Sequence, residues 1–168
     1  MPYPAGPEID KLSKSGKSKE YNFPRAMLHS GNYNFSFSGL KTSVRYFLEK
    51  QFPGGLPEEN LPDVCASVQE AIVEVLVKKS IDASVEHNVK HLIIAGGVSA
   101  NSCLRKRAID LARLQGIIVV VLNPEYCIDN AAMIGFIAEK RLLENGPEAY
   151  KDLTFKVNAS ALRAKRKK

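Results

Sequence analysis

Two adjacent glycines, Gly96 and Gly97, are the strongest chemical signal in the sequence. They follow an apolar, strand-like run at 91–95 and precede Asn101, which opens a predicted helix. At the carboxyl end of a strand in an α/β sheet, glycine lets the main chain approach a ligand without an intervening Cβ. The helix start offers N–H groups for an anion, and Asn101 could bind a ligand oxygen. A tight strand-to-helix turn, with Asn101 merely in the first helical turn, explains the same residues equally well.

A second candidate is Asp129, which lies between a predicted strand and a predicted helix. The same sheet edge that presents Gly96 and Gly97 should present its carboxylate, which beside a nucleotide pocket can serve as a metal ligand. Aspartate is also a favoured N-cap, which accounts for it without any ligand. Small side chains on the following helix would allow close packing and hold the carboxylate rigidly; they are Ala131, Ala132, Gly135 and Ala138.

Three other motifs do not support a site. The stretch SGKS at 15–18 resembles a phosphate loop, but Lys11 stands where that motif needs its first glycine, so a surface turn is predicted. His87 and His91 have the spacing of a metal pair on a helix, but Asn88 should end the helix between them. The three cysteines have no CxxC spacing, which favours ordinary reduced thiols over a disulfide framework or a zinc site.

Helices dominate the predicted first half of the chain. A short helix is expected within 6–16, and the alternation of large and small residues at 32–39 is typical of a strand. Ser38 should cap an amphipathic helix over 39–52. Apolar residues at three- and four-residue spacing predict a long helix over 63–88, roughly 40 Å in length.

Strands and helices alternate in the second half. Continuous apolar strands are predicted at 91–95 and 117–123, and they alternate with helices at 102–116 and 129–146. This alternation is the pattern of an α/β domain. The sheet edge where both strands end is therefore where the candidate residues should meet.

Composition limits the class of protein. A chain of 168 residues, 45% hydrophobic and 25% charged, has material for one compact domain. No apolar run approaches the roughly eighteen residues of a membrane span, and no signal peptide pattern opens the sequence, so a cytoplasmic protein without membrane contact is expected. Five charges of the net +6 lie in the basic tail 161–168, which leaves about +1 for the body. The tail could contact phosphate non-specifically, and solubilising terminal charge explains it as well.

Four sequence blocks together resemble the carboxyl-terminal part of one family. They are, in order, YPAGPEIDKL, FSFSGLKTSV, AGGVSANSCLR and CIDNAAMIGF. They resemble the TsaD family, the tRNA N6-adenosine threonylcarbamoyltransferases, formerly called O-sialoglycoprotein endopeptidases or glycoproteases. The resemblance implies an actin-like ATPase fold (ASKHA, RNase H-like) with a helical insertion. On this basis we expect one α/β domain over 1–160, with a helical part at about 38–88 and an adenosine-motif part at about 89–145.

The resemblance also implies roles for individual residues. Asp129 matches an aspartate that binds iron or zinc in the family. The residues that match adenylate-binding positions are Gly6, Asp10, Gly96, Gly97 and Asn101. Ala5 replaces the first glycine of the family's PGGP turn, so the geometry at Gly6 is open. No further catalytic residue is assigned.

The family's two histidine metal ligands, an HxxxH pair, belong to an amino-terminal half that this chain is expected to lack. The metal site would then be one-third present, and the chain would be a fragment without activity in isolation. The implied ligands are threonylcarbamoyl-adenylate, ATP or AMP, and the implied partners are the tRNA anticodon loop and, in bacteria, TsaB and TsaE.

The implied reaction moves the threonylcarbamoyl group from its adenylate to N6 of adenosine 37 of tRNA. Two other readings stay open. One is a nucleotide-binding kinase or ATPase of the same superfamily, and the other is a non-catalytic interaction fragment that self-associates through exposed apolar surface. Peptide hydrolysis, which the older family name implies, lacks a nucleophile–base pair or a complete metal motif here.

Overall fold

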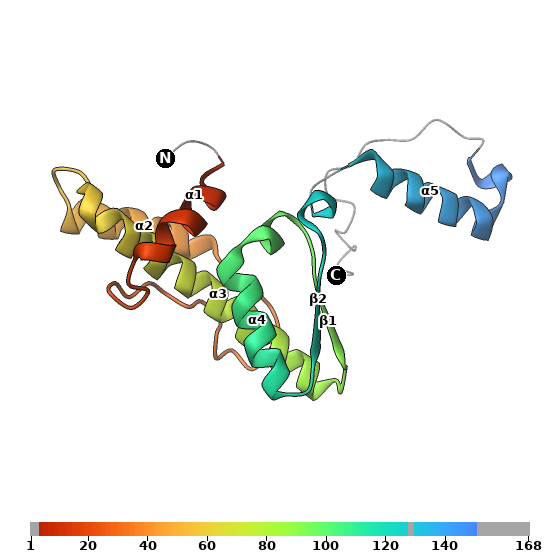
Figure 1. Ribbon diagram of the computed structural model, residues 1–168, viewed down its shortest axis with the longest axis horizontal. Coiled ribbons are helices and arrows are strands. Elements are labelled where there is room, and N and C mark those ends of the chain that lie inside the picture. The colour runs from red at the N-terminus through yellow and green to blue at the C-terminus, as the bar shows by residue number, and fades with distance from the viewer. Residues whose placement is uncertain (1–3, 128–129, 151–168) are drawn as a thin grey trace, which may run out of the picture. The chain divides into compact units, whose positions relative to one another are not determined.

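The computed structural model describes residues 4–127 and 130–150 (Figure 1). Its main elements are α1 (Ala5–Leu12), α2 (Ser38–Gln51), α3 (Leu61–Glu86), β1 (His91–Ile94), α4 (Ser102–Leu114), β2 (Ile118–Val121) and α5 (Ala131–Asn145). The chain divides into two compact units, Met1–Ile128 and Asp129–Lys168. The expectation of a single domain over 1–160 stays a prediction.

A small parallel sheet lies in the first unit. β1 and β2 pair in parallel, with His91 opposite Ile118. Leu92, Ile94 and Val119 turn toward the helices and pack against a buried apolar cluster. Since α4 connects the two parallel strands, the segment is a strand–helix–strand crossover. The mixed α/β character predicted from the alternating pattern is confirmed.

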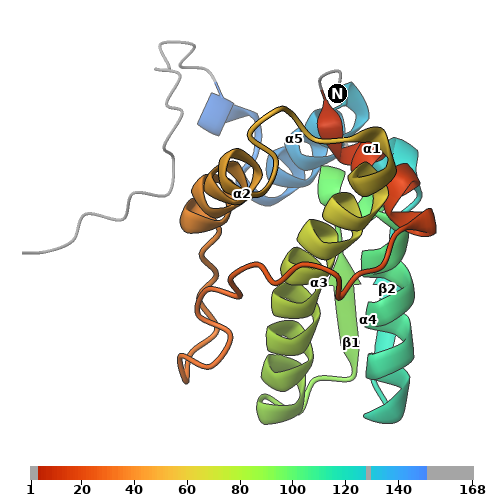
Figure 2. The same ribbon diagram turned by 90° about the vertical axis from the view of Figure 1, so that its left-hand side faces the viewer.

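Helix α3 is central to the first unit and lies between α2 and α4 (Figure 2). Toward the sheet and α4 it buries Val73, Val77 and Ile81. Toward α2 it contributes Ala71, with Val68 packed beside it. The helix is therefore apolar on more than one side, which is what a buried helix requires. The apolar residues from which the sequence predicts this helix are Val64, Val68, Ala71, Ile72, Val75 and Leu76. They include the side toward α2 and omit Val73, Val77 and Ile81 on the side toward the sheet.

An aromatic cluster fixes α2 to α3. Phe23, only 2% exposed, is buried together with Leu40 and Ala71. Its ring lies 5.1 Å from that of Phe47, and the ring of Tyr21 lies 4.9 Å from the same partner. The predicted amphipathic helix is thus confirmed within a residue at each end. The sequence reading did not anticipate that 21–23 would supply the facing side chains.

Residues 33–37 are not a strand, which corrects the prediction for this segment. The two phenylalanine rings do stack, 6.5 Å apart, as alternation requires. The backbone oxygens of Asn32 and Asn34 do not pair with a neighbouring strand, however, because they accept hydrogen bonds from the buried ammonium of Lys79, at 2.7 Å and 2.8 Å. The N-cap prediction for Ser38 is also wrong. It is the first residue of α2, and no side chain caps the helix.

The second unit contains α5. Its N-cap is Asn130, whose side-chain oxygen accepts a hydrogen bond from Met133 N at 3.0 Å. Gly146, with φ of 71°, ends the helix. No residue of α5 is buried in the structure, so close packing of its small side chains stays a prediction. Among the described helices, none is both long and apolar enough to cross a membrane.

Candidate functional site

The double glycine forms an exposed bend directly after β1. Gly96 has φ of 84° and ψ of 169°, a conformation essentially restricted to glycine. Gly97 begins a short 3₁₀ turn, Gly97–Ala100. A Cβ built on either glycine would meet no atom within 4 Å in the described structure. The bend is therefore open to a ligand rather than covered by neighbouring side chains.

A small apolar hollow of about 230 Å³ lies beside this bend. It is formed by residues of α3, β1, the 3₁₀ turn and α4, among them Leu76, Ser80, Ile94, Val98, Ser99 and Leu104. Its walls are mostly apolar, with hydroxyl groups from two serines. An uncharged ring system is the kind of group that such a surface favours.

Asn101 is the N-cap of α4. Its Oδ1 accepts a hydrogen bond from Leu104 N at 2.8 Å. Its Nδ2 donates to Oε1 of Gln69, on α3, at 2.6 Å. The alternative of a structural strand-to-helix turn is therefore realised, with Asn101 as the N-cap rather than within the first helical turn. The amide retains one N–H and one oxygen lone pair beyond these two bonds, because each amide atom can make two. Adenylate binding by Asn101 stays a prediction.

The carboxylate of Asp10, a residue of α1, binds the first residue of α4. Ser102 N donates to its Oδ2 at 3.1 Å, and Ser102 Oγ donates to its Oδ1 at 2.9 Å. Two N–H groups at the start of α4, those of Ser102 and Leu104, are therefore bound by Asp10 and Asn101, so the expectation of a helix start free for an anion is wrong for these two groups. The fold nonetheless brings two predicted substrate residues, 91 positions apart in the chain, to adjacent positions at one helix end. The sequence pattern alone gives no sign of this pairing.

Gly6 lies in the first turn of α1, one helical turn before Asp10. It is exposed, and a Cβ there would meet no atom within 4 Å in the described structure. The short helix predicted within 6–16 is confirmed, since α1 runs from Ala5 to Leu12 and includes Gly6. Residues four apart on a helix share a face, so Gly6 and Asp10 lie on one side of α1. Its contact with substrate stays a prediction.

Arg105 joins the loops that follow the two strands. Its guanidinium donates to Ser99 O and, at 3.4 Å, to Leu122 O. Ser99 Oγ also donates to the buried thiol of Cys127, at 2.9 Å. The chain leading to Asp129 is thus fixed to the same edge as the glycine bend, as parallel pairing requires. The sequence pattern gives no sign that Arg105 and Cys127 take part in this edge.

Asp129 lies outside the described residues, so its role as a metal ligand stays a prediction. In the described ranges 4–127 and 130–150, no group of three or more His, Cys, Asp or Glu side chains could hold a metal ion. His87 follows α3 directly, Asn88 has φ of 50°, and His91 begins β1. The prediction that Asn88 ends the helix is confirmed.

The cysteine prediction agrees with the structure. Cys65, Cys103 and Cys127 are all free thiols. Burial raises the pKa of the Cys65 thiol. Burial is also the main reason that the pKa of Cys103 is raised, with the Glu70 carboxylate adding to the effect. A raised pKa lowers the thiolate fraction, so these two side chains are poor nucleophiles.

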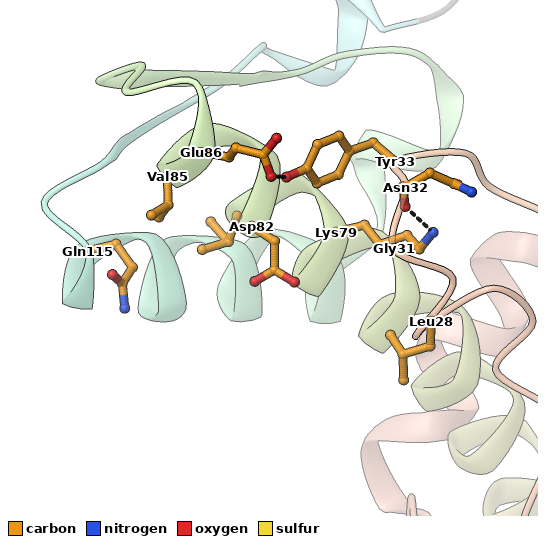
Figure 3. A pocket seen from close by; sticks show the side chains of 10 residues that line it. Leu28, Gly31, Asn32, Tyr33, Lys79, Asp82, Val85, Glu86 and Gln115 are labelled. Carbon is orange, nitrogen blue, oxygen red and sulfur yellow. Dashed lines mark hydrogen bonds between the residues drawn. The ribbon is translucent and has the colours of Figure 1, made fainter.

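A larger hollow of about 480 Å³ lies near the carboxyl end of α3 (Figure 3). Tyr33 and Lys79 line it, and Tyr33 Oη donates a short hydrogen bond to Glu86. That bond is the main reason that the pKa of Tyr33 is raised to about 12. Lys79 is 3% exposed and makes a third bond, to Ser30 Oγ at 3.0 Å. The hollow includes none of the predicted site residues.

Comparison with known proteins identifies the family. The family model described as TsaD, tRNA N6-adenosine threonylcarbamoyltransferase, matches residues 1–136. A protein of that name from Thermosipho africanus is 51% identical over 138 residues, covering 82% of this chain and 41% of the relative. Another from Chlorobium phaeobacteroides is 53% identical over 146 residues, with the same two coverages.

A third relative, from Chlorobium chlorochromatii, is 47% identical over 150 residues and covers 84% of this chain and 43% of its own length. The chain therefore spans about two fifths of the length of the curated relatives that it matches. The family match covers both predicted adenylate-binding regions. From these matches we conclude that the chain belongs to the TsaD family of tRNA N6-adenosine threonylcarbamoyltransferases.

Proposed function

We propose that this chain forms the adenylate-binding part of an enzyme that transfers a threonylcarbamoyl group from threonylcarbamoyl-adenylate to N6 of adenosine 37 in tRNA. The observation that carries the proposal is the exposed bend at Gly96 and Gly97. The related proteins are named for this transfer. We extend the same proposal to the actin-like ATPase fold, of which the strand–helix–strand crossover would form a part.

The two glycines support this proposal unequally. Gly96 has φ of 84°, so backbone geometry alone accounts for glycine there. Gly97 has no positive φ, and a Cβ would contact nothing in the described part of the chain. A ligand that lies against the main chain is a physical reason for its lack of a side chain. The adjacent apolar hollow offers such a ligand a surface suited to a purine ring.

The chain's own residues would bind and orient the donor. Asn101 has an N–H and an oxygen lone pair to spare, so it could hold a ribose or phosphate oxygen. The exocyclic amine of adenine is a poor nucleophile, and fixing the donor against it would reduce the entropic part of the barrier. Asp129 would supply one ligand to an iron or zinc ion, which when bound could polarise the donor carbonyl. That metal rests on the family resemblance alone.

Partners and location belong to the same proposal. The anticodon loop of tRNA would be the acceptor, because an unstacked loop base is accessible to a protein. TsaB and TsaE would be protein partners in bacteria, and the setting would be cytoplasmic. Ile93 and Ile118, 64% and 58% exposed on the sheet, would favour self-association of the chain in isolation.

A chimaera tests the proposed function. The segment of the Thermosipho africanus relative that aligns with this chain is replaced by the chain, and threonylcarbamoyl transfer to tRNA is measured. We expect the chimaera to retain transfer. Gly97→Val within it should raise KM for the adenylate donor, because a branched side chain would occupy the ligand's place.

The outcomes separate the alternatives. A folded chimaera that cannot transfer would contradict the proposal. ATP turnover without any requirement for tRNA would instead favour the kinase or ATPase reading. Unchanged KM in Gly97→Val, with normal transfer, would place the adenylate elsewhere in the enzyme.

A further inference from the structure

A hydrogen-bond network joins α1 and the turn that follows it to α3 and to the start of α4. Gln69, in the middle of α3, donates from Nε2 to Ser13 Oγ at 2.7 Å and accepts at Oε1 from Asn101 Nδ2 at 2.6 Å. Ser13 Oγ donates in turn to the backbone oxygen of Asp10 at 2.9 Å. The Asp10 carboxylate holds Ser102, the residue after Asn101. Every member thus contacts the next.

Gln69 is the buried member of this network. It is 7% exposed, whereas Asp10 and Asn101 are partly accessible and Ser102 is exposed. A buried amide in a helix costs free energy unless its polar atoms are paired. Gln69 pairs one donor and one acceptor with two different elements. Its position is therefore suited to fixing neighbours rather than to touching a ligand.

The bond to Gln69 determines which way the Asn101 amide faces. Leu104 N donates to the Asn101 oxygen, and the Asn101 nitrogen donates to Gln69 Oε1. A flip of the amide would therefore place donor against donor at Leu104 and acceptor against acceptor at Gln69. The remaining N–H and lone pair of Asn101 then point in fixed directions. Without Gln69, only the capping bond would restrain the side chain.

We propose that Gln69 is a positioning residue, which orients the amide of Asn101 for the adenylate and links it through Ser13 to Asp10. This inference rests on the proposed function, because it assumes that Asn101 meets the adenylate. Gln69 acts through Asn101 and does not touch the ligand. Its loss should therefore weaken binding even where the fold is kept.

The test measures AMP binding by calorimetry in the full 168-residue chain and three variants. Gln69→Met fills the same space without polar atoms and should weaken AMP binding about tenfold. Gln69→Glu keeps the oxygen that accepts from Asn101 and should restore affinity to within about threefold of wild type.

Ser67→Ala is the matched control. Ser67 is buried on the same helix and bonds Tyr21 N and Lys17 O, away from Asn101. It should lower the unfolding temperature as Gln69→Met does and leave AMP affinity unchanged. The side-chain NH₂ resonances of Asn101 provide a second readout, and they should shift in Gln69→Met and stay in place in Ser67→Ala.

The outcomes distinguish this inference from the function on which it rests. Wild-type affinity in a folded Gln69→Met, or an equal loss in Ser67→Ala, would overturn the positioning role alone. A wild-type chain that binds no AMP would overturn the adenylate site, and the positioning role with it. Weakening in Gln69→Met, with recovery in Gln69→Glu, supports both.

Discussion

Two turns of this chain depend on glycine for different structural reasons. The turn at 15–17 lies against the start of α3, where a Cβ on Gly16 would lie 2.0 Å from Pro62 O. The bend at Gly96 and Gly97 leaves open space around both residues. Gly16 has φ of −95°, which any residue can adopt, whereas Gly96 has φ of 84°. Packing therefore requires a glycine at position 16, and backbone geometry requires one at position 96. Neither packing nor backbone geometry requires a glycine at position 97.

Gly16→Ala should produce the largest effect. The added methyl would collide with backbone atoms of Pro62 and Asp63. Because these are backbone atoms, no side-chain rotation can relieve the collision. We expect a loss of about 3 kcal/mol in the free energy of unfolding, at the upper end of overpacking costs. Urea denaturation measures it. A loss below about 0.5 kcal/mol would show that the turn can move away from α3 at little cost.

Gly96→Ala should have the next largest effect, for a different reason. Space is available, but a Cβ makes this backbone conformation unfavourable. The expected loss in unfolding free energy is about 1–3 kcal/mol. Gly96→Asn should cost about as much, since asparagine tolerates positive φ mainly in the left-handed helical region and Gly96 has ψ of 169°. Equal stability of wild type and Gly96→Ala would contradict the assignment of backbone strain.

Asp63→Ala tests whether a hydrogen bond, in addition to packing, holds the turn at 15–17 against α3. Lys17 N donates to Asp63 Oδ1 at 2.7 Å, and Asp63 lies in the first turn of α3. Loss of this bond, together with the favourable charge at a helix N-terminus, should cost about 1 kcal/mol in unfolding free energy. Asp63→Asn, which keeps an acceptor, should recover part of it. No change in either variant would show that this bond adds nothing to the stability that packing at Gly16 provides.

Gly97→Ala should leave stability within about 0.5 kcal/mol of wild type. Neither the backbone nor the neighbours in the described structure oppose a methyl group there. Thermal unfolding, run beside Gly16→Ala, gives the direct contrast. A large destabilisation would mean that Gly97 is a structural glycine like the other two, and the main support for the adenylate site would be lost.

Local patterns predicted the elements well. The apolar runs at 91–95 and 117–123 gave both strands, and three- and four-residue spacing gave the long helix. The segment at 32–39 was mispredicted as a strand because the backbone oxygens of Asn32 and Asn34 accept from the Lys79 ammonium, which lies more than forty residues away. Alternation describes side chains and carries no information about where the backbone finds its partners.

The sequence points to candidate residues for the site but not to the contacts that connect them. The glycines and Asn101 stand out through type and spacing, but Gln69 is one polar residue within an apolar helix. Its contacts with Ser13 and Asn101 join positions 56 and 32 residues away. Such contacts follow from how α1 and α4 pack on α3, which no local pattern encodes.

Lys79 has a consequence for chemical labelling. Its ammonium is enclosed by one hydroxyl and two carbonyl oxygens from residues 30–34. A reagent that acylates amines can reach it only after that segment lifts from α3. The rate of its acylation therefore reports how often this part of the molecule opens, while the exposed amine of Lys17 serves as the internal reference.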